Sequence, residues 1–527
     1  MSNILSVDEL DSLRRSDGEW ALFDIREAAE ADAGHIPGAT FLPRRLIEFR
    51  IADLVPDIRT RIVLYDDGTS RRAELARDSL TRLGYTNVQI LGGGFVSWIG
   101  VGRTYTSGTN VPGKLFGERI HETKHVPFIS AGELKKWQDE NTEHIVCDIR
   151  TPSEYADKRI PGSQGAFGVD LVSLAQDLES KSAPIVVHCS GRTRGIIACQ
   201  TLRELGLKNV YALENGTMGW QLERFDLERQ PPRGVLVPTP ASVRHGKLRA
   251  RELAESVGVA AVSPEELKAL LAQRNARDKN VYVYDVRQVE EYVASHIKGT
   301  LPLPGGLAIQ RVDDFFSVRR ATLVLVDDDT GRAFLTAFWL KQLGCSHASV
   351  LSGGIQAWKE AGQAMETGRS RQPPLGLDAA IADTEFIAAE DLRERQPQPL
   401  IVHVDTSRSY ESARVPSAIW IPYGWLEYHL LSHMGSHETP VVLTCRDGMH
   451  SIFAAANLKR LGYSQVSVLE GGIKAWARHY QTESGWPAHM LRTPDVVTPP
   501  YESGLKAMSR YLKWELQLTK NLSEEVV

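Results

Sequence analysis

The most informative stretch of this chain reads Pro184-Ile-Val-Val-His-Cys-Ser-Gly-Arg-Thr-Arg-Gly195. Its apolar start predicts a short buried strand, and the residues that follow, 196–202, predict a helix. Where a strand turns into a helix, backbone N–H groups converge and stabilise an anion. Cys189 lies at this turn, with Arg192 and Arg194 beside it. We therefore predict a reactive cysteine with a lowered pKa rather than an inert core thiol.

The composition of the chain indicates a soluble protein of several domains. Its 527 residues predict about three to five domains, and 42% of them are hydrophobic. The net charge of −5 gives no basic surface for nucleic acid. Five cysteines without paired spacing indicate a reducing compartment. The start of the chain lacks a signal-peptide pattern and no apolar run could span a membrane, so we expect a cytoplasmic protein without a membrane partner.

Four landmarks recur four times in the same order. The first is a strand ending in aspartate, with a glutamate six residues later: Asp24, Asp148, Asp285 and Asp405, with Glu30, Glu154, Glu291 and Glu411. The second is an Ile-Pro-Gly-like turn, and the third is the loop after an apolar strand. The fourth is a glycine-containing turn followed by a tryptophan: Trp98, Trp220, Trp358 and Trp476. Strands alternating with helices predict a parallel sheet, whose ligands bind beyond the carboxyl ends of the strands.

Together these motifs resemble the rhodanese family of sulfurtransferases. The resemblance rests on Asp-x-Arg, the Ile-Pro-Gly turn, the Cys-x4-Arg loop and the Gly-Gly-x3-Trp ending, and it covers about residues 4–485. It implies an α/β fold of four tandem rhodanese-like domains, each a small parallel sheet with helices on both faces. We expect these domains, followed by a C-terminal helical tail, at residues 1–115, 116–232, 258–370, 382–485 and 486–527.

The segments between the domains suggest how the domains pair. The longest spacing between successive landmark aspartates separates Asp148 from Asp285, so we expect domain 1 to pair with domain 2 and domain 3 with domain 4. The basic segment 244–251 is expected to be a solvent-exposed linker. The tail predicts a helix docked on the body or on a second chain, which leaves a homodimer open. Its apolar stripe consists of Leu505, Met508, Leu512, Leu516 and Leu518, widened by Tyr511 and Trp514.

The third landmark differs among the four domains. Domains 2 and 4 carry Cys189 and Cys445 there, whereas domains 1 and 3 carry Asp66 and Asp327. An aspartate cannot bear a persulfide and repels an anionic donor, so we expect domains 1 and 3 to be non-catalytic, each beside an active domain. In domain 4, His450 replaces the closing arginine and is only partly charged at neutral pH. We expect Cys445 to be active while His450 is protonated; a relic loop with an ordinary thiol is the alternative.

The resemblance implies sulfur transfer in two steps. The Cys189 thiolate takes the outer sulfur of thiosulfate, sulfite leaves, and a thiol or cyanide takes the sulfur from the persulfide. Arg194 is expected to anchor the loop and Arg192 to meet the sulfonate, while backbone N–H groups stabilise the sulfur anions. No metal or cofactor is expected. The predicted catalytic residues are Cys189 and Cys445, and the predicted donor-binding residues are Ser190, Gly191, Arg192, Thr193, Arg194, Gly195, Arg446, Gly448 and His450.

Three alternative functions remain open. A phosphatase of related fold has five residues between cysteine and arginine, where this chain has four. A non-enzymatic binding array is favoured by the two aspartate loops. A third alternative is another donor, 3-mercaptopyruvate or a protein persulfide.

Several further residues are expected to be structural. Ser6 with Glu9, and Ser263 with Glu266, predict a capping box at the first helix of domains 1 and 3. Asp148 should anchor the chain after its strand, and Arg150 should pair with Glu154 on a helix turn. Trp220 is expected to pack in the core. Inert thiols are expected at Cys147, Cys199 and Cys345.

Overall fold

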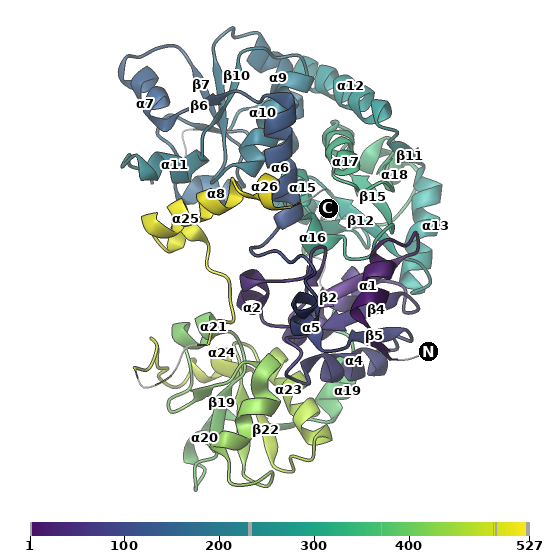
Figure 1. Cartoon of the computed structure of the whole chain (residues 1–527), viewed down its shortest axis with the longest axis vertical. Coiled ribbons are helices and arrows are strands. Elements are labelled where there is room, and N and C mark those ends of the chain that lie inside the picture. Colours follow the sequence, from purple (N-terminus) through teal and green to yellow (C-terminus); the bar gives the residue numbers. More distant parts are fainter. Residues whose placement is uncertain (1–2, 230–233, 370–371, 489, 491–492, 523–527) are drawn as a thin grey trace. The chain divides into compact units, whose positions relative to one another are not determined.

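Four domains of one architecture make up most of the chain (Figure 1). The structure, a computed structural model, describes residues 3–229, 234–369, 372–488, 490 and 493–522. Each domain has a five-stranded parallel sheet flanked by helices, and further helices follow domain 4. The predicted fold class is confirmed. The domain boundaries predicted at 232 and 370 lie outside the described residues.

Domain 1 shows the pattern that the other three repeat. Its strand order is β1-β5-β4-β2-β3, and all five residues of β2 are buried, as expected for a parallel sheet covered on both faces. The predicted capping box at its first helix is confirmed: Ser6 N donates to Glu9 Oε2 at 2.8 Å, and Glu9 N donates to Ser6 Oγ at 3.3 Å. The elements are β1 (Ile4–Leu5), α1 (Val7–Arg14), β2 (Trp20–Asp24), α2 (Ala28–Ala33), β3 (Thr40–Phe41), η1 (Arg44–Leu46), α3 (Ile47–Leu54), β4 (Arg61–Tyr65), α4 (Arg72–Arg82) and α5 (Gly94–Gly100), with β5 at Val88–Leu91.

Domain 2 carries the Cys189 loop, residues 189–195, between β9 and α10. The strand order is β6-β10-β9-β7-β8, so β9 lies in the middle of the sheet. Helix α6 precedes the domain and packs against α10. The elements are α6 (Val111–Lys124), β6 (Phe128–Ile129), α7 (Ala131–Asp139), β7 (Ile145–Asp148), α8 (Pro152–Asp157), β8 (Gln164–Gly165), η2 (Gly168–Asp170), α9 (Leu171–Glu179), β9 (Ile185–His188), α10 (Thr193–Glu204), β10 (Val210–Leu213) and α11 (Gly216–Leu222).

Domain 3 repeats the order as β11-β16-β15-β12-β14, with an additional antiparallel pair, β13-β17. The predicted capping box of Ser263 and Glu266 is confirmed at its first helix. The elements are β11 (Ala260–Val262), α13 (Pro264–Asn275), β12 (Val281–Asp285), α14 (Val289–Ala294), β13 (His296–Ile297), β14 (Leu301–Pro302), α15 (Gly305–Gln310), α16 (Val312–Phe315), β15 (Thr322–Val326), α17 (Arg332–Gln342), β16 (Ala348–Leu351), α18 (Gly354–Glu360) and β17 (Met365–Glu366).

Domain 4 has the order β18-β22-β21-β19-β20. Its elements are α19 (Leu377–Ala382), β18 (Glu385–Ile387), α20 (Ala389–Glu394), β19 (Leu400–His403), α21 (Ser407–Ser412), β20 (Ile419–Trp420), η3 (Tyr423–Trp425), α22 (Leu426–His429), η4 (Leu430–His433), β21 (Val441–Thr444), α23 (Met449–Arg460), β22 (Val466–Leu469) and α24 (Gly472–Trp476). The tail adds η5 (Pro500–Glu502), α25 (Leu505–Glu515) and α26 (Leu518–Asn521).

The chain divides into two compact units that do not follow the order of the sequence. One consists of Met1–Ser16, Trp20–Gly108 and Gln372–Val497, which are domains 1 and 4. The other consists of Asp17–Glu19, Thr109–Arg371 and Thr498–Val527, which are domains 2 and 3 with the C-terminal helices. The expected pairing of 1 with 2 and 3 with 4 is therefore wrong. Each unit nevertheless combines one aspartate-bearing and one cysteine-bearing domain.

The segment between domains 2 and 3 explains why those two domains share a unit. We expected an exposed linker, but the segment forms helix α12 (Pro240–Ser256), which packs on α9 and α17. The contact with α9 is close enough to need a glycine, because a Cβ built on Gly246 would lie 1.9 Å from the Val172 carbonyl oxygen. Lys247 forms an ion pair with Asp329 of domain 3. The linker thus holds the two domains together.

The tail helices dock on domain 2, as one of the two predicted alternatives stated. Met508 and Leu512 of α25 form a buried cluster with Met218 of α11. Leu518 lies with Leu115 of α6 in a second buried cluster. One member of the predicted apolar stripe is wrong: Leu516 is 45% exposed.

Candidate active site

The Cys189 loop accepts backbone hydrogen bonds from the turn that begins α11. Thr217 N donates to the Cys189 carbonyl oxygen at 2.9 Å, and Met218 N donates to the Ser190 carbonyl oxygen at 3.0 Å. Gly216 has φ +53°, and a Cβ there would lie 2.2 Å from the Cys189 carbonyl oxygen. The fourth landmark of the repeat therefore supports the loop of the third.

Cys189 is almost completely buried, at 3% exposure. Burial raises the pKa of its thiol above the ordinary value, and the Arg194 charge and the backbone N–H groups of Gly195 and Gly191 only partly offset this. The prediction of a lowered pKa is therefore wrong, because desolvation of the thiolate outweighs the nearby positive charge. The loop stabilises the thiolate as expected, but burial destabilises the thiolate more than the sequence indicated.

Arg194 anchors the loop through a two-point ion pair. Its Nη1 donates to Glu154 Oε2 and its Nη2 to Glu154 Oε1, both at 2.9 Å. Ser190 Oγ also donates to Glu154 Oε1, at 3.1 Å. Although burial alone would raise the pKa of Glu154, Arg194 and the hydrogen bonds from Thr151 hold that pKa well below its usual range. Glu154 is therefore a permanent anion that fixes the loop to α8.

Arg192 is bound by a residue from a different element. Its Nε and Nη2 donate to Glu118 of α6 at 2.7 and 2.8 Å, and its Nη1 donates to Asn215 Oδ1 at 3.2 Å. The guanidinium lies over the Phe128 ring at 5.0 Å from the ring centre. Its charge is thus matched by a carboxylate, and meeting a sulfonate as predicted would require it to leave Glu118.

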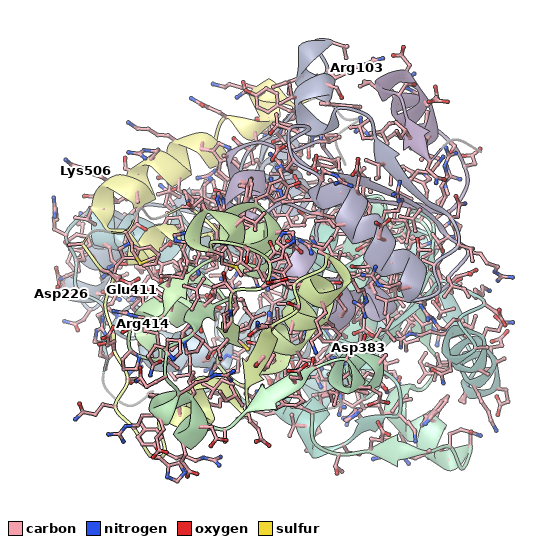
Figure 2. The ribbon with its side chains drawn as sticks, turned by 90° about the horizontal axis from the view of Figure 1, so that it is seen from below. Arg103, Asp226, Asp383, Glu411, Arg414 and Lys506 are labelled. Atoms are coloured by element: carbon pink, nitrogen blue, oxygen red, sulfur yellow. The ribbon has the colours of Figure 1, made fainter. Side chains whose placement is uncertain are left out.

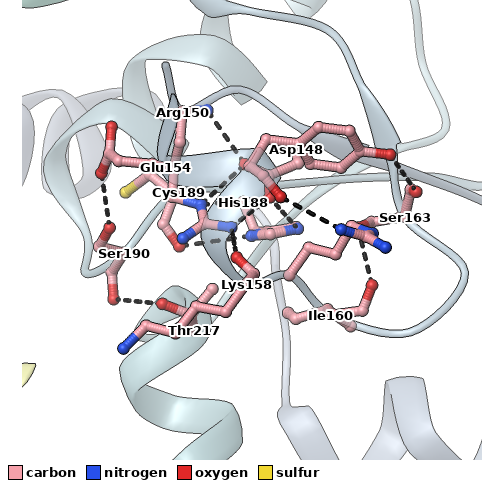
Figure 3. A network of polar contacts seen from close by, with 12 residues as sticks. Asp148, Arg150, Glu154, Lys158, Ile160, Ser163, His188, Cys189, Ser190 and Thr217 are labelled. Atoms are coloured by element: carbon pink, nitrogen blue, oxygen red, sulfur yellow. Dashed lines mark hydrogen bonds and ion pairs between the residues drawn. The ribbon is translucent and has the colours of Figure 1, made fainter. Parts of the chain in front are cut away.

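Asp148 and Arg150 form a second polar cluster behind the loop (Figure 3). Arg150 Nη2 donates to Asp148 Oδ2 at 2.6 Å, and Arg150 N donates to Asp148 Oδ1 at 3.1 Å. His188 Nε2 lies 3.7 Å from Asp148 Oδ2. The anchoring role predicted for Asp148 is confirmed. The predicted pair of Arg150 with Glu154 is wrong, because each side chain binds a different partner.

In domains 1 and 3, the aspartate fills its own loop. Asp66 accepts hydrogen bonds from Gly68 N at 2.8 Å and Ala73 N at 3.0 Å. Asp327 accepts from Asp329 N at 2.9 Å and from Gly331 N and Ala333 N at 3.1 Å. Backbone donors that could hold a bound anion are thus already used by a carboxylate of the chain.

The ion pair that anchors the loop recurs in both aspartate-bearing domains. Arg332 donates to Glu291 at 2.7 and 2.8 Å. Arg72 donates to Glu30 at 2.7 and 2.9 Å. The sequence comparison assigned Arg71 to this place in domain 1, but Arg72 closes the loop, which is therefore one residue longer than the Cys189 loop. Because this pair persists in domains without a cysteine, its first role is to support the loop.

The first landmark in domain 4 lies two residues earlier than the sequence predicted. In domain 2, Asp148 pairs across the sheet with His188, the residue before Cys189. In domain 4, His403 pairs with Thr444, the residue before Cys445. His403 therefore occupies the place of Asp148, and Asp405 does not. The sequence comparison assigned the wrong register to domain 4 because β19 ends in His403 and not in an aspartate.

The corrected register shows that both partners of the anchoring pair are replaced in domain 4. Ser409 N donates to the capping Thr406 Oγ1 at 3.2 Å, as Glu154 N donates to Thr151 Oγ1 at 3.3 Å. Ser409 thus takes the place of Glu154, and His450 takes that of Arg194. Glu411, predicted for this place, lies two residues further along α21.

The remaining features of the domain 4 loop give it little positive charge. Cys445 is fully buried, and burial raises the pKa of its thiol. Burial lowers the pKa of His450, whose ring stacks on Phe49 with centres 4.6 Å apart. The prediction of a partly charged His450 is thus not supported, because its surroundings favour the neutral imidazole. Arg446 is exposed to solvent, and Gly448 has φ +90°.

Other predictions concern residues away from the two loops. Trp220 packs in the core, with Nε1 donating to the Asp226 carbonyl oxygen at 2.9 Å. Burial raises the pKa of three further thiols to about 12, which supports their interpretation as inert: Cys147, Cys199 and Cys345. Within the described residues, no group of three or more His, Cys, Asp or Glu side chains could hold a metal ion. No helix in this part of the chain is long and apolar enough to cross a membrane.

Two acidic residues of the site were missed by the sequence analysis. Glu118 comes from α6 and Glu515 from α25, and Thr193 Oγ1 donates to Glu515 Oε1 at 2.8 Å. Neither segment belongs to the repeat, so the comparison of the four domains could not detect them. Only the buried position of each carboxyl beside the loop identifies them.

Comparison with known proteins matches the rhodanese-like domain to residues 6–100, 130–223, 263–361 and 388–479. The chain belongs to the rhodanese family. As a rhodanese-family sulfurtransferase, it is similar along almost its whole length to a thiosulfate sulfurtransferase from Pseudomonas aeruginosa. The crystal structure of that protein is 32% identical, covers 98% of this chain and 97% of its own, and superposes with a TM-score of 0.88.

Curated relatives match single rhodanese domains. A sulfurtransferase from Allochromatium vinosum is 33% identical over 106 residues, which are 20% of this chain and 83% of that protein. The Mycobacterium tuberculosis protein SseB is 33% identical over 100 residues, or 18% of this chain. The matched region spans only 35% of the length of SseB.

Proposed function

We propose that this protein transfers sulfane sulfur from thiosulfate to a thiol or cyanide through a persulfide on Cys189. The observation that carries the proposal is the arrangement around the sulfur: Cys189 lies in the loop between β9 and α10, the N–H groups of Gly191 and Gly195 favour its thiolate, and Arg194 is fixed beside it. The name of the Pseudomonas relative, a thiosulfate sulfurtransferase, supports this choice of donor.

The proposed reaction has two displacement steps. The Cys189 thiolate attacks the outer sulfur of thiosulfate, the S–S bond of the donor breaks, and sulfite leaves with the electron pair. The persulfide anion then lies where the loop N–H groups and Arg194 stabilise it. An acceptor thiolate or cyanide attacks the outer sulfur, and the Cys189 thiolate is the leaving group. No redox cofactor is needed, because both steps exchange one sulfur–sulfur or sulfur–carbon bond for another.

The loop residues have different proposed roles. Ser190, Gly191, Thr193 and Gly195 shape the pocket and present backbone donors, and Arg194 neutralises the persulfide. Arg192 acts on the donor only through movement away from Glu118, so we assign it first to holding the loop on α6.

Cys445 is a second proposed nucleophile with a weaker setting. Its thiol is buried, burial lowers the pKa of His450, and Ser409 and His450 stand where domain 2 has the anchoring ion pair. Arg446, Gly448 and His450 remain the proposed donor-binding residues of this loop. We expect Cys445 to contribute a minor share of turnover. We propose a reducing, cytoplasmic setting for both thiols, because the spacing of the five cysteines in the sequence is not that of a disulfide framework.

The test is thiocyanate formation from thiosulfate and cyanide by the full-length chain. Cys189→Ser is expected to remove most of the activity and Cys445→Ser little of it. If Cys189→Ser retained wild-type turnover, the proposal would be wrong. Phosphate release from an aryl phosphate would instead favour the phosphatase alternative.

A further inference from the structure

Helix α25 covers the Cys189 loop. A Cβ built on Gly191 would lie 3.7 Å from Tyr511 Cε1 and 3.7 Å from Glu515 Oε2. In Figure 1 the helix runs along domain 2 beside α8 and α11, and in Figure 2 Lys506 points from it to solvent. The inner face of α25 therefore contributes side chains to the surroundings of the cysteine.

Among the residues of α25 that lie near the loop, Glu515 is a buried carboxylic acid. It is 1% exposed, and Thr193 Oγ1 donates to its Oε1 at 2.8 Å. Its Oε2 is buried and has no hydrogen-bond partner among the described residues. A buried carboxyl oxygen without a partner is costly and calls for an explanation. This oxygen is directed toward Gly191, next to the reactive sulfur.

The two cations that act on Glu515, Lys114 and Arg192, also have other partners. Arg192 is bound at two points by Glu118, at 2.7 and 2.8 Å. Lys114 Nζ donates to the Thr109 carbonyl oxygen at 2.6 Å and lies 5.0 Å from the centre of the Tyr511 ring. The titratable and charged groups that face this region are Lys114 and Glu118 of α6, Cys189, Arg192 and Arg194 of the loop, and Tyr511 of α25.

We propose that Glu515 is a positioning residue that makes the Cys189 site discriminate between sulfur donors by their charge. When ionised, it disfavours a dianion such as thiosulfate relative to a donor of low charge, such as a neutral hydropersulfide. Glu515 acts through the field that it places on Cys189 and on the incoming donor, and it takes no part in bond exchange. This inference rests on the proposed function, because it concerns donors for the same cysteine.

Two effects follow from one buried charge. The charge raises the pKa of Cys189, which lowers the thiolate fraction for every electrophile. It also repels an anionic reagent but not a neutral one, and in a site without bulk water this repulsion is strong. Burial raises the pKa of Glu515 itself, so the carboxyl ionises at a higher pH than an exposed glutamate. The thiolate fraction changes both reaction rates equally. The ratio of the rate with an anionic reagent to the rate with a neutral one therefore isolates the repulsion.

The experiment measures alkylation of Cys189 by iodoacetate, an anion, and by iodoacetamide, which is neutral. Glu515→Gln keeps an acceptor for Thr193 and removes the charge. The iodoacetate-to-iodoacetamide rate ratio is expected to rise about tenfold in this variant, and the rate with thiosulfate should rise more than the rate with a hydropersulfide. In the wild type the same ratio should fall as pH rises and Glu515 ionises.

One matched control tests whether the effect is specific to this carboxyl. Glu223→Gln makes the same chemical change at an exposed position of domain 2 and should leave the ratio unchanged. An unchanged ratio in Glu515→Gln, even with faster alkylation by both reagents, would overturn the inference and leave α25 as a simple cover. If that variant fails to fold, a wild-type ratio independent of pH would overturn it as well.

Failure of the proposed function would give a different result from failure of this inference. Alkylation requires no sulfur transfer, so the ratio reports on Glu515 even if Cys189 never gains a sulfur. A persulfide on Cys189 combined with an unchanged ratio would reject only the role of Glu515.

Discussion

Arg194 in the first turn of α10 and Glu154 in the first turn of α8 form a two-point ion pair, with both N–O distances at 2.9 Å. The pair ties the Cys189 loop to a helix that follows a different strand. Because the same pair occurs between Arg332 and Glu291 in domain 3, its first role is to fix the loop. In domain 2 this also places a cation beside the sulfur.

Arg194→Met should weaken both stability and chemistry. We expect the free energy of unfolding to fall by about 2 kcal/mol, because Glu154 is left partly buried without its cation. The rate of persulfide formation at Cys189 should fall by about 10²-fold, since a fixed charge beside the sulfur is lost. Urea unfolding and single-turnover mass spectrometry measure the two effects. Arg72→Met removes the equivalent pair in domain 1 and should leave the Cys189 rate unchanged; an equal loss of rate there would contradict this account.

The reaction of Cys189 with a neutral alkylating reagent should accelerate as pH rises. Burial holds the pKa of this thiol above its ordinary value, so the thiolate is a minor species at neutral pH and its fraction grows about tenfold per pH unit. We expect an increase through about pH 9 without a plateau. A plateau already reached near neutral pH would show that the loop lowers the thiol pKa, as the sequence alone indicated.

Asp327→Asn should destabilise the unit formed by domains 2 and 3. Burial raises the pKa of Asp327, so loss of its charge is not the main cost. The cost arises because the amide NH₂ of asparagine would face backbone N–H groups that now donate to the carboxylate. We expect the free energy of unfolding to fall by about 1–2 kcal/mol, measured by urea denaturation. Glu290→Gln, at an exposed position of the same domain, should have little effect.

His450 should contribute little charge to the domain 4 site. Its pKa is lowered by burial, so it gains a proton only as pH falls below the ordinary range of histidine. Replacing it with glutamine should therefore change the thiosulfate reaction of Cys445 by less than about twofold at about pH 7.5. Single-turnover mass spectrometry in the Cys189→Ser background measures this rate. A tenfold loss at that pH would show that the histidine is protonated.

Local features of the chain could be predicted from the sequence because they depend on nearby residues. The alternation of apolar strands and helices gave the four sheets, and the spacing of Ser6 and Glu9 gave a capping box. The position of Cys189 between β9 and α10 followed from one apolar run. The anchoring role of Asp148 followed from its recurrence at the end of a strand.

Features that depend on distant segments could not be predicted. Glu118 and Glu515 reach the Cys189 loop from helices outside the repeat. The pairing of domains 1 with 4 and 2 with 3 arises from tertiary packing, which spacing between repeats does not encode. The sign of the Cys189 pKa shift depends on total burial, and neighbouring arginines alone gave the wrong sign. In domain 4, the sequence comparison placed the first landmark at the wrong residue because His403 stands where the other domains have an aspartate.

The most direct test of the proposed persulfide is the intact mass of the chain after brief reaction with thiosulfate and removal of excess donor. Wild type, Cys189→Ser and Cys445→Ser should be compared at the same pH. We predict that wild type and Cys445→Ser gain the mass of one sulfur atom, which cyanide then removes, and that Cys189→Ser gains little. If Cys189 acquired no sulfur while the chain stayed folded, the proposed role of the Cys189 loop would be wrong.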